Sequence, residues 1–409
     1  MLDLFVKVKQ DFVTRKTMRS IVCLHSTVLP TGTSWTMKRA EPMSVDVRAH
    51  VVRANGVFDR SDELQSAGHE QVVFCRDAET GLKAIISVHD TTLGPALGGT
   101  RFRPYGSEAA ALTDVLRLSQ GMTFKAAAAG MPLGGGKAVI IGDPTLLKTT
   151  GLLRAYGRFI DSLHGRYVSA ADVGTTSDDL DIIGETTRHV VGRTSAAGGS
   201  GDSGFSTAYG VFCAMRAAAD AVWGDGGLQG RVVGIEGVGK VGVHLVGLLR
   251  ELGAEVFVSD PHPAALDRVR DLYVGVGVVD SVSDHDIDIY APCALGASLT
   301  PSSVAQLSAS LVCGAANNQL LTSDVGELLR SRNITWVPDF VANAGGLIQV
   351  GGELQDKSDE QVLADIERIG TTVSEILATA LDRSVSTGAA AMGIVQARLT
   401  AARVTESLP

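Results

Sequence analysis

Cysteine is scarce in this chain of 409 residues, and the five cysteines present match neither a disulfide framework nor a zinc site. Their number is odd, their spacings are long and no Cys-x-x-Cys occurs. The nine histidines also lack the His-x-x-x-His and His-Glu-x-x-His spacings of zinc enzymes. We therefore expect a cytoplasmic protein without a metal, and leave open a metal site built from carboxylates alone.

Long apolar runs and an excess of positive charge are also missing. The apolar runs fall far short of the roughly 20 residues that cross a bilayer, so we expect no membrane partner. The formal net charge of −9 argues against a nucleic-acid partner, because binding to a phosphate backbone needs clustered lysine and arginine. A small-molecule ligand fits this composition better.

Apolar residues make up 45% of the chain, enough for two buried cores in a chain that is long for one domain. Residues 1–55 differ from the rest, with several basic residues, few acids and no sustained periodicity. We interpret them as an extension that is disordered or precedes the true translation start, with Met43 as an alternative beginning. A transit peptide is a weaker alternative.

From residue 70 onward, short periodic segments predict alternating strands and helices. In the first half these are strands over residues 71–75 and 84–89, a helix from Ser107 as N-cap toward Lys125, a strand over 138–141 and a helix over 152–163. The three glycines at 134–136 are expected to form a turn before the third strand.

The second half predicts a βαβ unit and further strands, as in a parallel doubly wound sheet. The segments are a helix over 211–222, strands over 232–236 and 255–260 around a helix over 241–252, strands over 287–290, 311–313 and 335–337, and helices over 359–382 and 389–404.

A dinucleotide-binding motif, G-x-G-x-x-G, stands between a predicted strand and a predicted helix as Gly237-Val238-Gly239-Lys240-Val241-Gly242. In this context the glycines allow a tight turn, close approach of a pyrophosphate and close packing of the helix, whose N-terminus attracts phosphate. Asp260 ends the next strand, where a carboxylate would bind the adenosine ribose and repel a 2′-phosphate, and no arginine follows directly. The pattern predicts NAD rather than NADP; the alternative is a glycine turn that serves packing alone.

Two lysines and an aspartate form a second group: Lys125, the run Gly134-Gly135-Gly136-Lys137, and Asp172. The run is not a phosphate loop, because the Walker pattern needs a glycine at Met131 and Ser or Thr at Ala138. Oxidative deamination needs a cation for the substrate carboxylate, a base that activates water and a proton shuttle for nitrogen, which these residues could supply. A lysine acts as a base near neutrality only if burial or another cation lowers its pKa. From the residues alone, surface or salt-bridged side chains are an equal alternative.

The order of these motifs resembles the family of glutamate, leucine, valine and phenylalanine dehydrogenases. The similarity covers about residues 68–380, in segments 93–101, 122–125, 134–137, 172–175, 237–242, 291–293, 314–318 and 341–346. The first 55 or so residues have no counterpart.

By this resemblance, Lys125 would pair with the substrate carboxylate, Lys137 would be the general base on water and Asp172 would relay the proton of the amine. Asn318 would add a hydrogen bond to the carboxylate. The other residues implied to hold the cofactor are Thr207, Ala291, Pro292, Cys293 and Asn317.

The resemblance also indicates the substrate side chain. Glutamate dehydrogenases of the family place a lysine just before the glycine pair, where this chain has Leu97 before Gly98. A leucine cannot pair with a buried carboxylate, whose desolvation costs several kcal/mol, so glutamate is rejected. The other implied pocket positions are aliphatic as well: Ala170, Leu347 and Val350. We expect valine or leucine as substrate, without a choice between them, because one methylene is worth about 1 to 3 kcal/mol.

The predicted fold class is α/β, with an α/β substrate domain with a mixed sheet (56–200), a Rossmann-type doubly wound NAD-binding domain (201–350) and a cleft between them. Helices over 351–409 would return to the substrate domain. The expected reaction yields a 2-oxo acid and ammonia, in a homo-oligomer. Alternatives are a phenylalanine dehydrogenase, another NAD-dependent dehydrogenase such as one for 2-hydroxy acids, and a non-catalytic NAD-binding regulatory protein.

Overall fold

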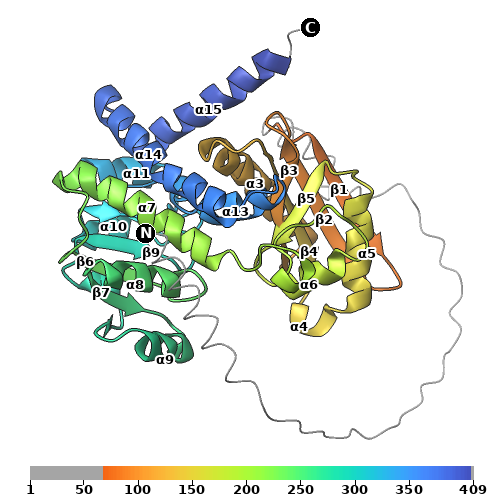
Figure 1. Cartoon of the computed structure of the whole chain (residues 1–409), viewed down its shortest axis with the longest axis horizontal. Coiled ribbons are helices and arrows are strands. Elements are labelled where there is room, and N and C mark those ends of the chain that lie inside the picture. Colours follow the sequence, from red (N-terminus) through yellow and green to blue (C-terminus); the bar gives the residue numbers. More distant parts are fainter. Residues whose placement is uncertain (1–67, 407–409) are drawn as a thin grey trace, which may run out of the picture. The chain divides into compact units, whose positions relative to one another are not determined.

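The computed structural model describes residues 68–406 (Figure 1). The extension expected over residues 1–55 lies outside the described residues, as does the domain start at residue 56. The described part contains two β-sheets, one of five strands and one of six.

The five-stranded sheet has the order β1-β2-β4-β3-β5 and is mixed, as predicted: β1, β2 and β4 pair antiparallel, whereas β3 pairs parallel with β4 and β5. Its strands are β1 (Gln71–Asp77), β2 (Leu82–Asp90), β3 (Ala96–Arg103), β4 (Gly134–Ile141) and β5 (Tyr167–Ala171). The helices of this half are α3 (Glu108–Ala128), α4 (Pro144–Leu147), α5 (Thr150–Asp161) and α6 (Ser177–Ile183). The predicted cap is confirmed, because the Ser107 side chain accepts a hydrogen bond from the Ala110 N–H at the start of α3.

The prediction of a turn at residues 134–136 is wrong, because these glycines begin strand β4. They serve close packing instead: a Cβ atom on Gly134 would overlap the carbonyl oxygen of Asp90, and one on Gly135 would overlap the backbone of Thr123 in α3. Without side chains at these positions, α3 packs directly on β4. The helix that carries Lys125 therefore lies against the strand that carries Lys137.

The six-stranded sheet is parallel throughout and has the doubly wound order β11-β10-β9-β6-β7-β8, which confirms the predicted fold class. Its strands are β6 (Val232–Glu236), β7 (Glu255–Ser259), β8 (Gly277–Val278), β9 (Ile289–Pro292), β10 (Leu311–Val312) and β11 (Thr335–Trp336). The helices of this half are α7 (Gly204–Trp223), α8 (Gly242–Glu251), α9 (Pro263–Leu272), α10 (Pro301–Gln306), α11 (Asp324–Ser331), α12 (Asp339–Ala342) and α13 (Gly345–Glu353).

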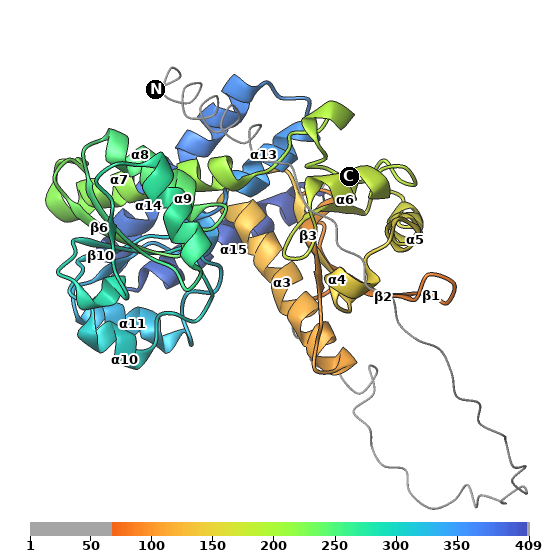
Figure 2. The same cartoon turned by 90° about the horizontal axis from the view of Figure 1, so that it is seen from below.

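Two long helices, α14 (Asp359–Arg383) and α15 (Thr387–Glu406), complete the described chain (Figure 2). Helix α14 packs along α7, where the Tyr209 hydroxyl donates to Glu367 at 2.6 Å. Helix α15 contacts α3, where Arg398 Nη1 donates to the carbonyl oxygens of Ala127 and Ala128, at 2.6 Å each. Helix α15 therefore caps the end of the helix that carries Lys125.

The segment between the two sheets, which includes the glycine-rich residues 198–204, is held by hydrogen bonds from Gly192 and Ser200 to α13. One carboxylate oxygen of Glu353 accepts from the Gly192 N–H at 3.0 Å and from both the N–H and the hydroxyl of Ser200, at 2.9 and 2.7 Å. From the same helix, Gln349 Nε2 donates to the Ser200 carbonyl oxygen at 2.8 Å.

Among residues 68–406, no helix is long and apolar enough to cross a membrane. The four cysteines in that range are free thiols: Cys75, Cys213, Cys293 and Cys313. The same range contains no group of three or more His, Cys, Asp or Glu side chains placed to hold a metal ion.

Candidate active site

A cavity of about 840 Å³ is lined by residues from both halves of the described chain. One wall comes from the five-stranded sheet and α3, and the other from α7, the start of α8 and α13. The predicted site residues that line it are Leu97, Gly98, Lys125, Lys137, Ala170, Asp172, Thr207, Lys240, Val241, Asn317, Leu347 and Val350. The tertiary structure thus brings into one cavity residues that are far apart in the sequence.

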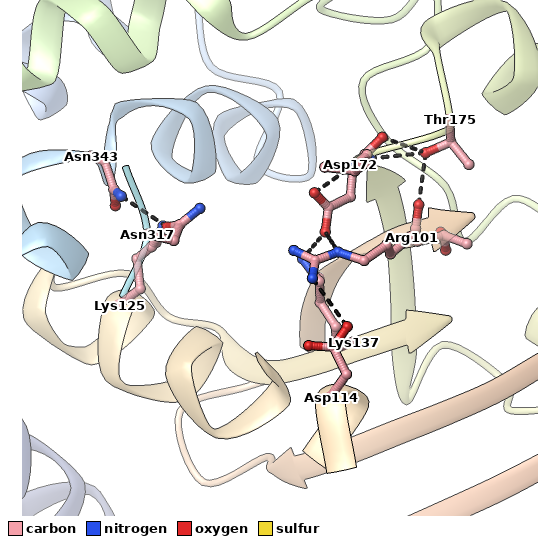
Figure 3. A network of polar contacts seen from close by, with 12 residues as sticks. Arg101, Asp114, Lys125, Lys137, Asp172, Thr175, Asn317 and Asn343 are labelled. Carbon is pink, nitrogen blue, oxygen red and sulfur yellow. Dashed lines mark hydrogen bonds and ion pairs between the residues drawn. The ribbon is translucent and has the colours of Figure 1, made fainter. Parts of the chain in front are cut away.

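Lys137 and Asp172 form an ion pair on one wall of the cavity. The Lys137 Nζ lies 2.5 Å from Oδ2 of Asp172 (Figure 3). The other carboxylate oxygen accepts a hydrogen bond from the Val173 N–H at 2.7 Å. Burial raises the pKa of Asp172, but the charges of Lys137 and Arg101 outweigh it and lower the pKa to about 2. Asp172 is therefore a charged carboxylate directed at the lysine.

Lys125 lies in the last turn of α3, beside two asparagines from the other half. Its Nζ donates to Asn317 Oδ1 at 3.1 Å, and Asn343 Nδ2 donates to the same oxygen at 2.8 Å (Figure 3). Burial lowers the pKa of Lys125 to about 8; the Lys137 cation acts in the same direction, and the carboxylates of Asp339 and Asp172 oppose it. Because an ammonium has three N–H donors, Lys125 can bind an anion in addition to Asn317.

Asn343, which was not predicted from the sequence as a site residue, also lines the cavity. It stands between α12 and α13, and its Nδ2 holds Asn317 and the Ala315 carbonyl. Its buried Oδ1 has no hydrogen-bond partner among residues 68–406. A buried amide oxygen of this kind is suited to accept a hydrogen bond from a ligand. In the sequence, Asn343 was distinguished only by lying in the segment 341–346.

Asn318, predicted to bind the substrate carboxylate, is not brought into the cavity. Its side chain is exposed, its φ of 53° is left-handed, and its backbone N–H donates to the carboxylate of Asp339. The asparagines beside Lys125 are Asn317 and Asn343 instead. The left-handed backbone at Asn318 was not apparent from the sequence pattern.

Four aliphatic side chains form a hydrocarbon part of the cavity wall. Leu97 comes from β3, Ala170 from β5, and Leu347 and Val350 from α13, and all four side chains are buried. None of them can pair with a charge, so this end of the cavity favours an aliphatic group.

The glycine-rich turn joins β6 to α8, as predicted. Gly237 has a left-handed φ of 94°, and a Cβ atom on Gly242 would overlap the Gly237 carbonyl oxygen. A Cβ atom on Gly239 would meet open space. The first and third glycines are therefore required by the turn itself, whereas the second leaves the backbone accessible to a ligand.

Asp260 follows β7 and supports this turn. Its Oδ2 accepts from the Val238 N–H at 2.9 Å, and its Oδ1 from the His262 N–H at 2.8 Å. Burial opposes ionisation, but these hydrogen bonds lower the pKa of Asp260. Arg268 of α9 also reaches the turn, where its Nη2 lies 2.9 Å from the Val238 carbonyl oxygen. This arginine was missed because it does not follow Asp260 directly in the sequence.

The other predicted cofactor residues fall into two groups. Lys240 and Thr207 line the cavity, where Lys240 pairs with Asp202 at 3.2 Å and the Thr207 hydroxyl donates to the Ser203 carbonyl. Ala291, Pro292 and Cys293, like Gly237, Gly239 and Asp260, lie outside the cavity lining. They stand at the carboxyl ends of β9, β6 and β7, which share one edge of a parallel sheet, and that edge is the usual ligand-binding edge.

Comparisons with known proteins found family models and relatives that match most of the chain. Residues 69–189 match the family model "Glu/Leu/Phe/Val dehydrogenase, dimerisation domain", and residues 272–405 match "Glutamate/Leucine/Phenylalanine/Valine dehydrogenase". The chain is 48% identical to a valine dehydrogenase of Streptomyces virginiae, over 85% of this chain and 99% of that protein. It is 44% identical to a leucine dehydrogenase of Bacillus cereus, over 84% of this chain and 94% of that protein.

Among solved structures, the L-tryptophan dehydrogenase from Nostoc punctiforme has a TM-score of 0.72 at 41% identity, over 84% of this chain and 99% of that chain. Relatives named for valine, leucine and tryptophan are thus similar to this chain at identities of 41 to 48%. Overall sequence identity therefore does not distinguish between these substrate side chains.

Proposed function

Because the chain belongs to the glutamate/leucine/phenylalanine/valine dehydrogenase family, we propose that it oxidatively deaminates a branched-chain aliphatic L-amino acid, valine or leucine, with NAD. One observation carries the proposal: Lys125, Lys137 and Asp172 share a cavity that is also lined by the aliphatic side chains of Leu97, Ala170, Leu347 and Val350. The amino acid, water and NAD+ give the 2-oxo acid, ammonium, NADH and a proton, and the reaction is reversible.

Each charged side chain has a separate task. The Lys125 ammonium pairs with the substrate carboxylate, and the unpaired Oδ1 of Asn343 accepts a hydrogen bond from the bound ligand. Asp172 exchanges a proton with the substrate nitrogen. Lys137 removes a proton from the water that attacks the iminium carbon. A bound dinucleotide would supply the acceptor for the hydride of the substrate Cα.

The hydrocarbon wall selects the side chain. Leu97, Ala170, Leu347 and Val350 each remove apolar substrate surface from water, at about 25 cal/mol per Å². A glutamate carboxylate placed there would lose its hydration without gaining a partner. An aromatic amino acid is the second candidate, favoured by the similarity to a tryptophan dehydrogenase.

The turn at residues 237–242 fits a dinucleotide, because it combines an accessible Gly239 backbone with the N-terminus of α8. Gly237, Lys240, Val241 and Gly242 would hold the pyrophosphate, and Asp260 the adenosine ribose. NAD is proposed over NADP because the Asp260 carboxylate would repel a 2′-phosphate. Thr207, Asn317 and residues 291–293 would hold the nicotinamide half.

We further propose a division into a substrate domain (56–200), an NAD-binding domain (201–350) and C-terminal helices (351–409), in a cytoplasmic homo-oligomer. The match of residues 69–189 to a dimerisation domain supports the oligomer. The free thiols at the described cysteines are compatible with a reducing compartment.

The proposal is tested by initial rates of NAD(P)H formation with valine, leucine, isoleucine, phenylalanine, tryptophan, alanine and glutamate, each with NAD and with NADP. We expect the three branched-chain substrates to give the highest kcat/KM with NAD. Glutamate should be slower by about 10³-fold, the equivalent of roughly 4 kcal/mol for an unpaired carboxylate.

Higher kcat/KM with phenylalanine or tryptophan than with all three branched-chain substrates would replace the aliphatic substrate by an aromatic one. Equal rates with NADP would remove the role given to Asp260. The reverse reaction should require ammonia; a 2-oxo acid reduced without ammonia would instead indicate a 2-hydroxy-acid dehydrogenase.

The pKa of Lys125 leads to a second prediction. Because this ammonium loses its proton as the pH rises through about 8, KM for the 2-oxo acid should be constant below that pH and increase up to tenfold per pH unit above it. The 2-oxo acid is a suitable ligand because its carboxylate does not titrate in this range. A KM that stays flat from pH 7 to pH 9.5, measured in the reductive direction, would exclude Lys125 as the carboxylate partner.

A further inference from the structure

Arg101 is a partly buried cation beside the site, and none of the roles proposed for the reaction uses it. It lies on β3, after Leu97 and Gly98, and 16% of its side chain is exposed. It is absent from the residues that line the cavity in the described chain. Any contribution of Arg101 must therefore act through another residue rather than through contact with the substrate.

The guanidinium lies between two carboxylates from different elements. Its Nη1 donates to Asp114 Oδ2 at 3.0 Å, and its Nε lies 3.5 Å from Asp172 Oδ2. The Tyr105 hydroxyl donates to the same oxygen of Asp114 at 2.7 Å. Asp114 belongs to α3, and Asp172 follows β5. Arg101 thus connects the helix that carries Lys125 to the loop that carries Asp172 (Figure 3).

The contact with Asp172 is incomplete. The Nε–H of Arg101 is buried and has no hydrogen-bond partner among the residues that the structure describes. A separation of 3.5 Å is longer than a normal N–H···O bond, and Lys137 holds the same carboxylate oxygen at 2.5 Å. A shift of the carboxylate by less than about 1 Å, from Lys137 toward Arg101, would complete the bond.

We propose that Arg101 is a positioning residue, which holds the Asp172 carboxylate in place and keeps its charge compensated when Lys137 turns from Asp172 to the attacking water. This inference rests on the roles proposed above for Lys137 and Asp172. A buried carboxylate that loses its single cationic partner is costly, and a second cation within reach removes this cost. The guanidinium is suited to the task because it stays protonated and offers N–H donors in a fixed plane, so that one nitrogen holds Asp114 while another receives Asp172.

The first test compares Arg101→Met, which keeps the length of the side chain but removes its charge, with Arg101→Lys. We expect Arg101→Met to lower kcat for the best amino acid roughly 10- to 100-fold, with KM and the Kd of NAD within about threefold of wild type. Arg101→Lys should recover part of the loss in kcat, because it restores the charge but not the two separate donors of the guanidinium. The matched control is Arg154→Met, which removes an arginine from a half-exposed pair with Glu185 and should leave kcat unchanged.

The decisive test repeats Arg101→Met in an Asp172→Asn background. If Arg101 acts through Asp172, the second substitution should change the residual kcat by less than about threefold. The same 10- to 100-fold loss in both backgrounds, or no recovery with Arg101→Lys, would overturn the proposal.

Thermal unfolding of the same variants separates this proposal from the proposed function, because it needs no turnover. We expect Arg101→Met and Asp172→Asn together to lower Tm by clearly less than the sum of their separate effects, since each removes a partner of the other. Additive Tm changes would overturn the role of Arg101 even in an active enzyme. A wild-type chain without amino-acid dehydrogenase activity would overturn the proposed function, and non-additive Tm changes would still support the contact.

Discussion

Replacement of Lys137 by alanine is expected to lower kcat by at least about 10³-fold, with the Kd of NAD within about twofold of wild type. The loss is large because Lys137 is the cavity lysine paired with Asp172, and positioned general acid–base groups contribute about 10² to 10⁴ in rate. NAD binding should persist because Lys137 lies on β4, whereas the glycine-rich turn belongs to the six-stranded sheet. The measurements are steady-state kinetics and NAD titration by fluorescence.

The matched control is Lys83→Ala. Lys83 is an exposed lysine on β2 of the same sheet, paired with Glu108 of α3, and its removal should leave kcat unchanged. Turnover like that of wild type in Lys137→Ala would remove Lys137 from the mechanism. A parallel loss of NAD affinity would show that the substitution had disturbed the cavity as a whole. Asp172 should stay compensated in this variant by Arg101, so we expect the folded state to be retained.

Replacement of Gly98 by alanine is expected to destabilise the fold by at least about 3 kcal/mol, because an added Cβ atom would overlap the backbone carbonyl of Gly136. A backbone atom cannot rotate away as a flexible side chain can, so β3 and β4 would have to separate. The measurement is the free energy of unfolding from denaturant titration, with loss of folded protein as the extreme result.

Gly121→Ala is the control, for which we expect a higher rather than a lower free energy of unfolding. This glycine lies in α3, and its added Cβ atom would meet open space. Alanine should therefore stabilise the helix by about 0.5 to 1 kcal/mol. Equal unfolding free energies for Gly98→Ala and wild type would show that the two strands can move apart and that Gly98 is not needed for their packing.

The periodicity of the sequence predicted most of the secondary structure, because apolar spacing reflects which face of an element is buried. Strand β6 has the predicted bounds, and Ser107 caps α3 as expected. The glycines at 134–136 were misinterpreted because their partners, Asp90 and Thr123, are distant in the chain. A local pattern cannot distinguish a glycine that turns the backbone from one that admits a neighbouring helix.

The residues of the candidate site also fall into those that the sequence predicted and those that only the structure identified. By itself, the sequence determined the fold class, the family and the residue types at the site, since Lys125, Lys137, Asp172 and the turn at 237–242 belong to recognisable motifs. Only the tertiary structure decided that Asn317 and Asn343, and not Asn318, lie beside Lys125. It also decided that Arg101 lies within reach of Asp172, and that Arg268 lies within reach of the glycine-rich turn. Motifs record which groups the chain carries along its length, whereas hydrogen bonds and ion pairs depend on distances between groups that only folding brings together.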